Sequence, residues 1–128
     1  DCSHSKINQN GISQLKNIIN LYAGFNIYIY DVNHLKKIKE LYCGSSTITQ
    51  NGISEIKSLV KLNAGSNTYI NDINHMQNLE ILYCYGTSKI DQYGISKLSN
   101  LIKLDMIQNN NIYNINHLEK LESFSFFN

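Results

Sequence analysis

The stretch His34-Leu-Lys-Lys-Ile-Lys-Glu-Leu-Tyr-Cys43 returns 41 residues later as His75-Met-Gln-Asn-Leu-Glu-Ile-Leu-Tyr-Cys84. The rest of the chain keeps nearly the same step. Gly-Ile-Ser occurs at residues 11–13, 52–54 and 94–96, and a third cysteine, Cys2, precedes Cys43 by 41 residues. Because self-similarity at a fixed period is the sequence signature of a repeat architecture, the period has to be interpreted before any single residue.

The apolar residues divide this unit again, into halves of 20 to 22 residues. Each half carries the pattern L-x-x-L-x-x-L-x-(A/C), whose end alternates apolar and polar residues like a strand with one buried face. The L-x-x-L spacing before it is closer to that of a helical turn. The pattern begins at Leu15, Leu35, Ile56, Met76, Leu98 and Leu118. We expect seven parallel strands, centred near Cys2, Leu21–Ala23, Leu41–Cys43, Leu62–Ala64, Leu82–Cys84, Leu104–Met106 and Phe124–Phe126.

A polar residue of a preferred helix N-cap type stands shortly before each of these patterns. The six residues are Ser13, Asn33, Ser54, Asn74, Ser96 and Asn116. The side-chain oxygen of such a residue accepts a hydrogen bond from a free N–H at the start of a helix. Each half thus predicts a short strand, a polar turn and a capped turn of α- or 3₁₀-helix. One such unit cannot bury its apolar face alone, but stacked neighbours share a continuous core.

With these aligned rows the chain resembles the leucine-rich repeat family, whose signature is L-x-x-L-x-L-x-x-N/C-x-L at 20–29 residues per repeat. The resemblance implies an α/β solenoid with a curved parallel sheet on its concave face and short helical or 3₁₀ turns on its convex face. We interpret residues 1–128 as a single domain of about six repeats plus a partial first repeat. A sandwich or a helical bundle would suit the composition, but neither requires a repeat register.

The resemblance also assigns structural roles to polar and small residues that follow the strands. An asparagine ladder inside the turns would satisfy backbone groups of adjacent repeats, as buried polar groups require; its members are Asn26, Asn67 and Asn109. Hydroxyl residues would do the same less completely in the alternate repeats, at Ser5, Ser46 and Thr87. Glycines come directly after three strands, where a turn can require a positive φ; they are Gly24, Gly44 and Gly65.

The three cysteines do not form a pattern typical of disulfides or of a metal site. Their position holds Ala23, Ala64 and Met106 in the alternate rows, so it needs a small or pliable apolar side chain. Rows two apart are separated by about 9–10 Å, whereas a disulfide needs Cα atoms within roughly 7 Å. We therefore expect buried free thiols, which favour a reducing, intracellular setting.

The histidines His34, His75 and His117 also share one repeat position. The alternate rows place Gln14, Glu55 and Lys97 there, so we expect exposed turn residues. Rings two rows apart cannot share a zinc ion, which binds each nitrogen at about 2.0–2.1 Å. No serine or cysteine stands beside a histidine at an unrepeated spot, so the pattern indicates no nucleophile and base pair. We expect no catalytic residue, no metal and no cofactor.

The composition excludes some classes of partner. The net charge is +1, arginine and proline are absent, and the 11 lysines are scattered, which argues against nucleic-acid binding. No apolar run is long enough to span a bilayer and no leader is visible, so we expect no membrane association and a cytoplasmic location. Asparagine and isoleucine occur 19 times each. In this bias the chain is similar to leucine-rich repeat proteins of mimivirus-type giant viruses and amoebae, which suggests a viral protein or an amoebal one; if it is viral, we expect it in the host-cell cytoplasm.

Both ends of the sequence lack the polar caps that repeat arrays need. Asp1-Cys2 aligns with Tyr42-Cys43, which places residue 1 inside a strand, and the chain stops just after the last strand, at Phe126-Phe127-Asn128. We therefore expect a fragment of a longer array, or ends that another segment or subunit covers.

The outward side chains of the strands remain as candidate binding residues. In many proteins of the resembled family the concave sheet is the binding surface, and solenoids in general use it so. Tyr22, Tyr42 and Tyr83 share one repeat position, interrupted by Asn63, and exposed tyrosine is over-represented in interface hot spots. We expect Tyr42 and Tyr83 to anchor a partner within a polar rim. The candidate site is Tyr22, Glu40, Tyr42, Lys61, Asn63, Tyr83, Tyr85, Lys103 and Asp105.

These observations favour a non-catalytic module that binds a protein partner on its concave face. The alternative is a structural assembly element that stacks end to end through its exposed termini. An A/T-rich coding sequence would by itself enrich tyrosine, and the nine tyrosines agree with that. The identity of the partner is beyond what the sequence determines.

Overall fold

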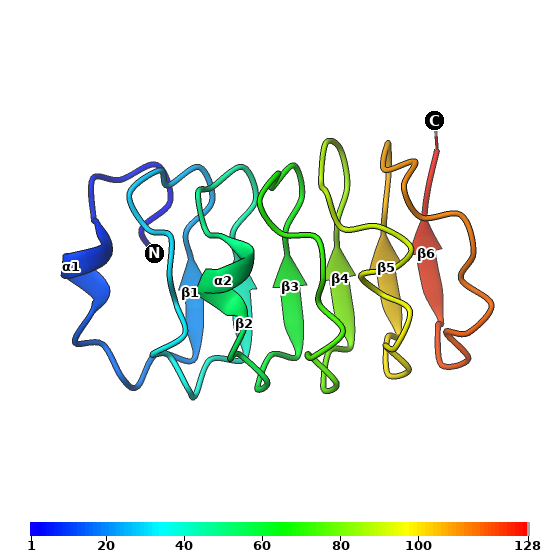
Figure 1. The fold of residues 1–128 in the computed structure, drawn as a ribbon, viewed down its shortest axis with the longest axis horizontal. Helices are drawn as coiled ribbons and strands as arrows, with labels where there is room; N and C mark the ends of the chain where they lie inside the picture. Colours follow the sequence, from blue (N-terminus) through cyan, green and yellow to red (C-terminus); the bar gives the residue numbers. More distant parts are fainter. Residues whose placement is uncertain (128) are drawn as a thin grey trace.

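The backbone returns to the same side of the molecule at every repeat and forms a three-residue strand there (Figure 1). The structure is a computed structural model, which describes residues 1–127. The strands are β1 (Asn20–Tyr22), β2 (Glu40–Tyr42), β3 (Lys61–Asn63), β4 (Ile81–Tyr83), β5 (Lys103–Asp105) and β6 (Ser123–Ser125). Each pairs in parallel with the next, in the order β1-β2-β3-β4-β5-β6. The expected solenoid with a curved parallel sheet is confirmed.

The expected strand at Cys2 is not part of the six-stranded sheet, although its hydrogen bonds continue the ladder. The Cys2 N–H donates to the Tyr22 carbonyl at 2.8 Å, and the His4 N–H donates to the Gly24 carbonyl at 3.1 Å. Residue 1 leaves too little chain before Cys2 for a full strand. The other six strands lie where we expect them, each centred about one residue earlier than predicted.

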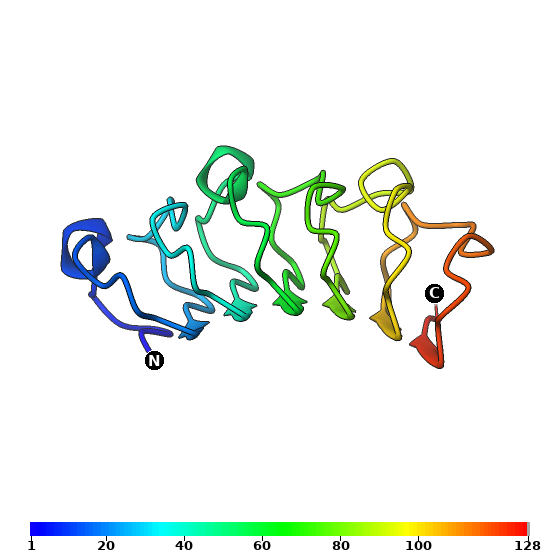
Figure 2. The ribbon, with the colours of Figure 1, turned by 90° about the horizontal axis from the view of Figure 1, so that it is seen from below.

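The chain forms an arch, with the strands along its inner side and the turns along its outer side (Figure 2). The outer side carries two short helices, α1 (Gln9–Ile12) and α2 (Gln50–Ile53). Turns without a regular helix take their place in the other repeats. The expected short helical turns on the convex face are therefore present in two repeats.

The predicted N-caps Ser13 and Ser54 are wrong, because the helices lie before these serines and not after them. Asn8 and Thr49 are the N-caps, and their side-chain oxygens accept from the N–H groups of Gly11 and Gly52 at 3.1 and 3.0 Å. Ser13 and Ser54 are the C-caps of the same helices. Their hydroxyls donate backward to the carbonyls of Asn10 and Asn51. A hydroxyl can cap either end of a short turn, so residue type alone did not fix the direction.

The core is the stack of inward side chains between the sheet and the convex turns. The middle strands bury their central leucines completely, and the small position of each, such as Cys43, Ala64 and Cys84, is 0% exposed. The terminal rows have a neighbour on one side only. For that reason Leu15 and Phe124 are 45% and 51% exposed although they align with buried residues.

Two kinds of coil alternate along the solenoid, each consisting of a strand and the turns that follow it. The coils at residues 1–19, 40–60 and 81–102 carry Gly-Ile-Ser, and we call them glycine coils. The coils at residues 20–39, 61–80 and 103–122 carry Asn-His, and we call them histidine coils. Their alternation is the origin of the 41-residue period.

Candidate interaction site on the concave face

The first and third residue of each strand point out of the concave face, because side chains alternate between the two faces of a strand. The parallel register brings Tyr22 beside Tyr42, Tyr42 beside Asn63, and Asn63 beside Tyr83. A second file joins Glu40, Lys61, Ile81 and Lys103. Asp105 continues the first file beside Tyr83, so eight of the nine predicted site residues belong to these two files, and Tyr85 lies just beyond β4.

Lysines and tyrosines alternate along the centre of this face. The rings of Tyr22 and Tyr42 stack with centroids 4.5 Å apart. The Lys61 ammonium lies 5.0 Å from the ring centroid of Tyr42 and 5.9 Å from that of Tyr83. The Lys103 ammonium, from the next strand, lies 5.4 Å from the Tyr83 centroid. A cation within about 6 Å of a ring centroid is attracted by the ring. We call Tyr22, Tyr42, Lys61, Tyr83 and Lys103 the concave file.

This arrangement differs from the expected polar rim, since Lys61 lies between Tyr42 and Tyr83, and Lys103 lies against the other side of Tyr83. The reason is the register, because neighbouring strands place a lysine diagonally opposite the rings of Tyr42 and Tyr83, within reach of a long side chain. One carboxylate oxygen of Asp105 is already engaged within the chain, because its Oδ1 accepts from the Ile107 N–H at 3.2 Å. Asn63 likewise accepts from the Gly65 N–H at 3.1 Å.

Lys61 is held in its charged form. The pKa of Lys61 lies above its ordinary value, chiefly through the neighbouring Tyr42 side chain and further through the attraction of Glu40. The Glu40 carboxylate is 3.9 Å from the Lys61 ammonium and accepts from the Tyr42 hydroxyl at 3.4 Å. The concave file is thus ordered by contacts among its own side chains and with Glu40.

Tyr85 closes one end of a shallow groove beside the file. Its ring lies directly on Gly65, where a Cβ would overlap the ring atoms. The groove, of about 240 Å³, continues over Gly24 and Gly44 and is bordered by Tyr22, Tyr42 and Phe25. Tyr22 and Tyr85 are each 37% exposed. The groove extends the concave file toward the ends of the strands.

The glycines that floor this groove do not have the positive φ that the sequence predicted. Positive φ values occur one residue later, at His4, Phe25, Ser45, Ser66, Gly86 and Gln108. Gly44 is required for another reason, because a Cβ there would lie 2.9 Å from the Gly65 carbonyl oxygen. The close approach of neighbouring coils selects this glycine.

The predicted asparagine ladder is confirmed. The Asn67 amide donates to the carbonyls of Cys43 and Ile48 at 3.1 Å each, and its oxygen accepts from the N–H groups of Tyr69 and Ile70 at 2.8 and 3.1 Å. Asn26 repeats all four bonds, whereas Asn109 repeats the two that its amide donates and accepts from the Asn111 N–H. Thr87 is exposed and Ser88 is buried in its place, because one additional residue in this coil shifts the register.

The histidines are not the exposed residues that we expected. His34, His75 and His117 are half-buried, and each Nε2 lies 3.0 to 3.1 Å from a carbonyl oxygen of the preceding coil. A carbonyl only accepts, so Nε2 carries the proton. The prediction of exposure was drawn from the polar residues that hold this repeat position in the other kind of coil. It was wrong because the position makes different contacts in the two kinds of coil.

Sequence reasoning missed a glutamine ladder on the convex side. The Gln50 oxygen accepts from the N–H groups of Asn71 and Asp72, and its amide donates to the Asp72 carbonyl at 2.7 Å. Gln9 and Gln92 make equivalent bonds. Their 41- and 42-residue spacing was a signal in the sequence. These residues hold coils together and are not available to a partner.

The cysteines are buried and free, as predicted for Cys2, Cys43 and Cys84. Burial raises the pKa of Cys43 and of Cys84 to about 12, so both remain protonated. Within residues 1–127, no group of three or more histidine, cysteine or acidic side chains is placed to hold a metal ion. In the same residues, no helix has the length and apolar character needed to cross a membrane.

Known structures share this architecture. An internalin of Listeria monocytogenes superimposes with a TM-score of 0.71 at 26% identity, over 92% of this chain and 37% of that chain. The fold is a leucine-rich repeat solenoid. A leucine-rich repeat protein of Leptospira interrogans gives 0.68 at 24% identity, over 91% and 33%. An internalin C2 of Listeria monocytogenes gives 0.54 at 19% identity, over 91% and 74%.

The chain spans about a third of the length of the first two structures. No protein-family model matches it, and no curated protein matches it significantly.

Proposed function

We propose that this leucine-rich repeat domain is an interaction module that binds a protein partner across its concave face. The observation that carries the proposal is the concave file, in which alternating aromatic and cationic side chains are ordered before any partner arrives. Tyrosine offers a large apolar area and a hydroxyl group. Ordering these side chains in advance lowers the entropy lost on binding.

The contrast with the rest of the surface supports this placement. The polar side chains of the ladders bond to backbone groups, so they serve the fold. Along the concave file the rings and ammonium groups contact one another, and their outer edges face solvent. A partner that contributes apolar and acidic side chains would gain contacts there with little rearrangement of this chain.

The experiment replaces both predicted anchors and compares the loss of partner affinity with the loss caused by replacing two other tyrosines. Tyr42→Ala combined with Tyr83→Ala should weaken the partner's affinity at least tenfold, about 1.4 kcal/mol. The matched control is Tyr93→Ala with Tyr113→Ala, because these convex side chains are 83% and 82% exposed and lie outside the file. Proteins captured from the native cell by the control but lost with the concave variant identify the partner, whose dissociation constant is then measured on both.

The alternative, end-to-end assembly, makes the opposite prediction. Phe126 and Phe127 are 60% and 58% exposed at the last coil. If assembly is the function, polar substitutions there abolish self-association while the concave variant behaves normally. Equal binding by the concave variant and the convex control would overturn the proposal for the concave face.

A further inference from the structure

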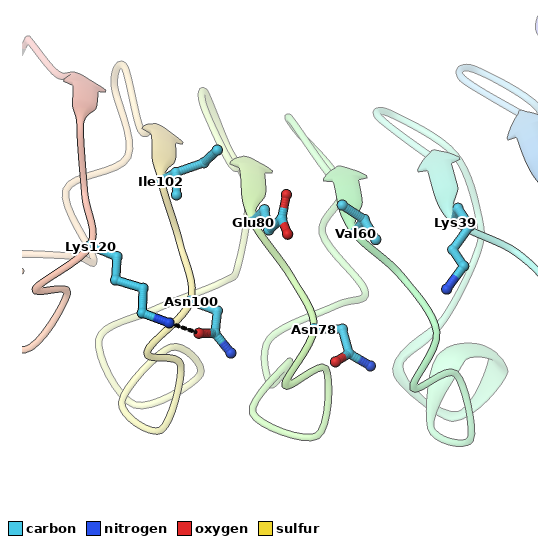
Figure 3. A pocket seen from close by; sticks show the side chains of 7 residues that line it. All are labelled: Lys39, Val60, Asn78, Glu80, Asn100, Ile102 and Lys120. Atoms are coloured by element: carbon cyan, nitrogen blue, oxygen red, sulfur yellow. Dashed lines mark hydrogen bonds between the residues drawn. The ribbon is translucent and has the colours of Figure 1, made fainter.

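Two hollows next to the sheet differ in the charge of their lining. The larger, of about 610 Å³, lies at the edge where the strands begin, and Lys39, Glu80 and Lys120 give it charges of both signs (Figure 3). The smaller is the groove of about 240 Å³ over Gly24 and Gly44, and within residues 1–127 no lysine, aspartate or glutamate lines it. Its aromatic borders and uncharged lining favour a neutral, partly apolar ligand.

Two pairs of stacked rings border this groove. Tyr22 stacks on Tyr42 and Phe25 stacks on His4, each pair with ring centroids 4.5 Å apart. Phe25 is 58% exposed although its φ is +58°. A bulky residue in this left-handed conformation is strained. The turn sets the φ but does not select phenylalanine, because the next coil has Ser45 at the equivalent position. A ligand that covers the ring would account for it.

Gly24 is not selected by the close approach that selects Gly44. A Cβ at Gly44 would lie 2.9 Å from the Gly65 carbonyl oxygen. A Cβ at Gly24 would make only ordinary contacts, with the Gly44 carbonyl oxygen at 3.7 Å and with Ser3 Oγ at 3.9 Å. Because Ser3 also lines the groove, a side chain at residue 24 would enter it. The bare backbone there leaves room for a ligand, not for a neighbouring coil.

The hydrogen-bonding groups of the groove favour a ligand that accepts. The Gly24 carbonyl already accepts from the His4 N–H at 3.1 Å, and the Gly44 carbonyl accepts from the Phe25 N–H at 2.9 Å. The side-chain oxygen of Asn63 is likewise engaged by a backbone N–H, and its amide nitrogen remains a donor. A peptide N–H, or the several hydroxyls of a sugar, would meet acceptors that are already engaged, and an unpaired donor is costly to desolvate.

Proline meets these conditions. It has no backbone N–H, and a polyproline II segment has no internal hydrogen bonds, so its carbonyls are free to accept. Segments of this kind dock in grooves lined by aromatic side chains.

We propose that the groove binds an X-Pro unit of a proline-rich segment in the protein partner. The proline ring lies over Gly24 between Phe25 and Tyr22, and the Asn63 amide donates to a carbonyl of the segment. The inference rests on the proposed function, because it names the kind of segment that the partner presents beside the concave file.

The test titrates the isotope-labelled protein with a blocked hexaproline peptide and follows the amide signals by NMR. A contact of about two residues gives a dissociation constant of about 1 mM, which this measurement detects. The amide signals of Gly24, Phe25 and Gly44 should shift. A blocked peptide of equal length with alternating alanine and serine should bind at least fivefold more weakly. No shift with hexaproline, equal affinity for both peptides, or tighter binding of glucose would each overturn the proposal.

Variants locate the contact. Gly24→Val fills the groove, and Phe25→Ser removes one wall while keeping a residue type that the next coil has at this position. Each should weaken hexaproline binding at least fivefold. Tyr69→Ala is the control, because Tyr69 is 53% exposed and lies outside the groove. Unchanged binding by both groove variants would contradict the proposal. The comparison of peptides on the unchanged protein decides even if a variant fails to fold.

The outcomes distinguish this inference from the proposed function. If hexaproline does not bind but Tyr42→Ala with Tyr83→Ala weakens the partner's affinity, the groove proposal falls and the proposed function stands. If hexaproline binds the unchanged protein while the double tyrosine variant keeps its full affinity for the partner, the groove proposal stands and the concave file is not the partner site.

Discussion

We call the contact between two neighbouring coils a joint. The joint between a glycine coil and the histidine coil that follows it differs from the joint between a histidine coil and the glycine coil that follows it. The first kind is tied by long polar side chains: Gln50, Asn67 and His75 all bond backbone groups across it. The second kind brings backbones close together. A Cβ on Gly52 would overlap the Tyr30 carbonyl oxygen, and Asn33 bridges to Asn51 and Glu55 at 2.7 and 2.9 Å.

The difference explains why the period is two coils and not one. A glycine coil presents glutamine on one side and a bare glycine backbone on the other, so it fits only between two histidine coils. Coupling between repeats is a sum of nearest-neighbour interfaces, and here two interfaces of different chemistry alternate. Neither uses the concave file, so the stability of the fold and binding on that face are separable by mutation.

The largest effect is expected where the backbones approach most closely. Gly52→Ala should destabilise the domain by about 3 kcal/mol, because the new methyl group meets a backbone carbonyl that cannot move away independently of its coil. Gly94→Ala should behave similarly, since its Cβ would overlap the Asn71 carbonyl oxygen. Urea unfolding measures both values.

Gly11→Ala is the matched control for that prediction. The same Gly-Ile-Ser sequence surrounds it, but the nearest atom to its Cβ is the Ile7 Cγ2 at 3.3 Å, in a side chain that can move. Alanine also has the higher helix propensity. The variant should be within about 1 kcal/mol of the original protein, and an equal loss at all three glycines would show that the close joint is not the cause.

The side-chain joint should show a smaller loss. Asn67→Ala should cost about 2 kcal/mol, because it leaves buried backbone groups of two coils without partners. Ser46→Ala, in the preceding coil, is the variant with which this loss of stability is compared. The Ser46 hydroxyl serves only its own coil, donating to the Cys43 carbonyl and accepting from the Ile48 N–H. Ser46→Ala should therefore cost less, and an Asn67→Ala variant with an unchanged melting temperature would contradict the ladder.

The two kinds of coil also differ in the small residue that faces the core, which predicts a pH effect. Burial raises the pKa of Cys43 from 9.0 to about 12. The folded state therefore holds the proton more tightly, so this contribution to stability is complete below about pH 9 and is lost as the pH rises toward 12. At pH 10 the loss should be about 1 kcal/mol.

Cys43→Ala supplies the reference for this smallest effect. Alanine fills the same position in neighbouring coils, at Ala23 and Ala64, so the variant should fold. Its unfolding free energy should fall less between pH 8 and pH 10 than that of the original protein. The other titrating groups are the same in both proteins, and parallel pH profiles would indicate that the thiol is not desolvated.

The sequence determined the architecture because the repeat is regular in residue type as well as in spacing. Leu41, Leu62 and Leu82 recur at strand positions, so the parallel sheet, its order and the inward rows were predictable, and Asn67 was identified as a buried ladder residue. The positions of Tyr42 and Tyr83 on the concave face followed from the same alternation. Their role as partner anchors stays a proposal.

Tertiary structure decided the features that depend on a neighbouring coil. The sequence placed His75 in solvent, and only the stacked coil brings a carbonyl within 3.0 Å of its ring. It assigned Gly44 to a special φ, whereas the close approach of the next coil excludes a Cβ there. It placed Lys61 in a rim, whereas the register sets it between two rings. Spacing along one chain shows which residues recur, but contacts between coils depend on their separation and register, which exist only once the stack has formed.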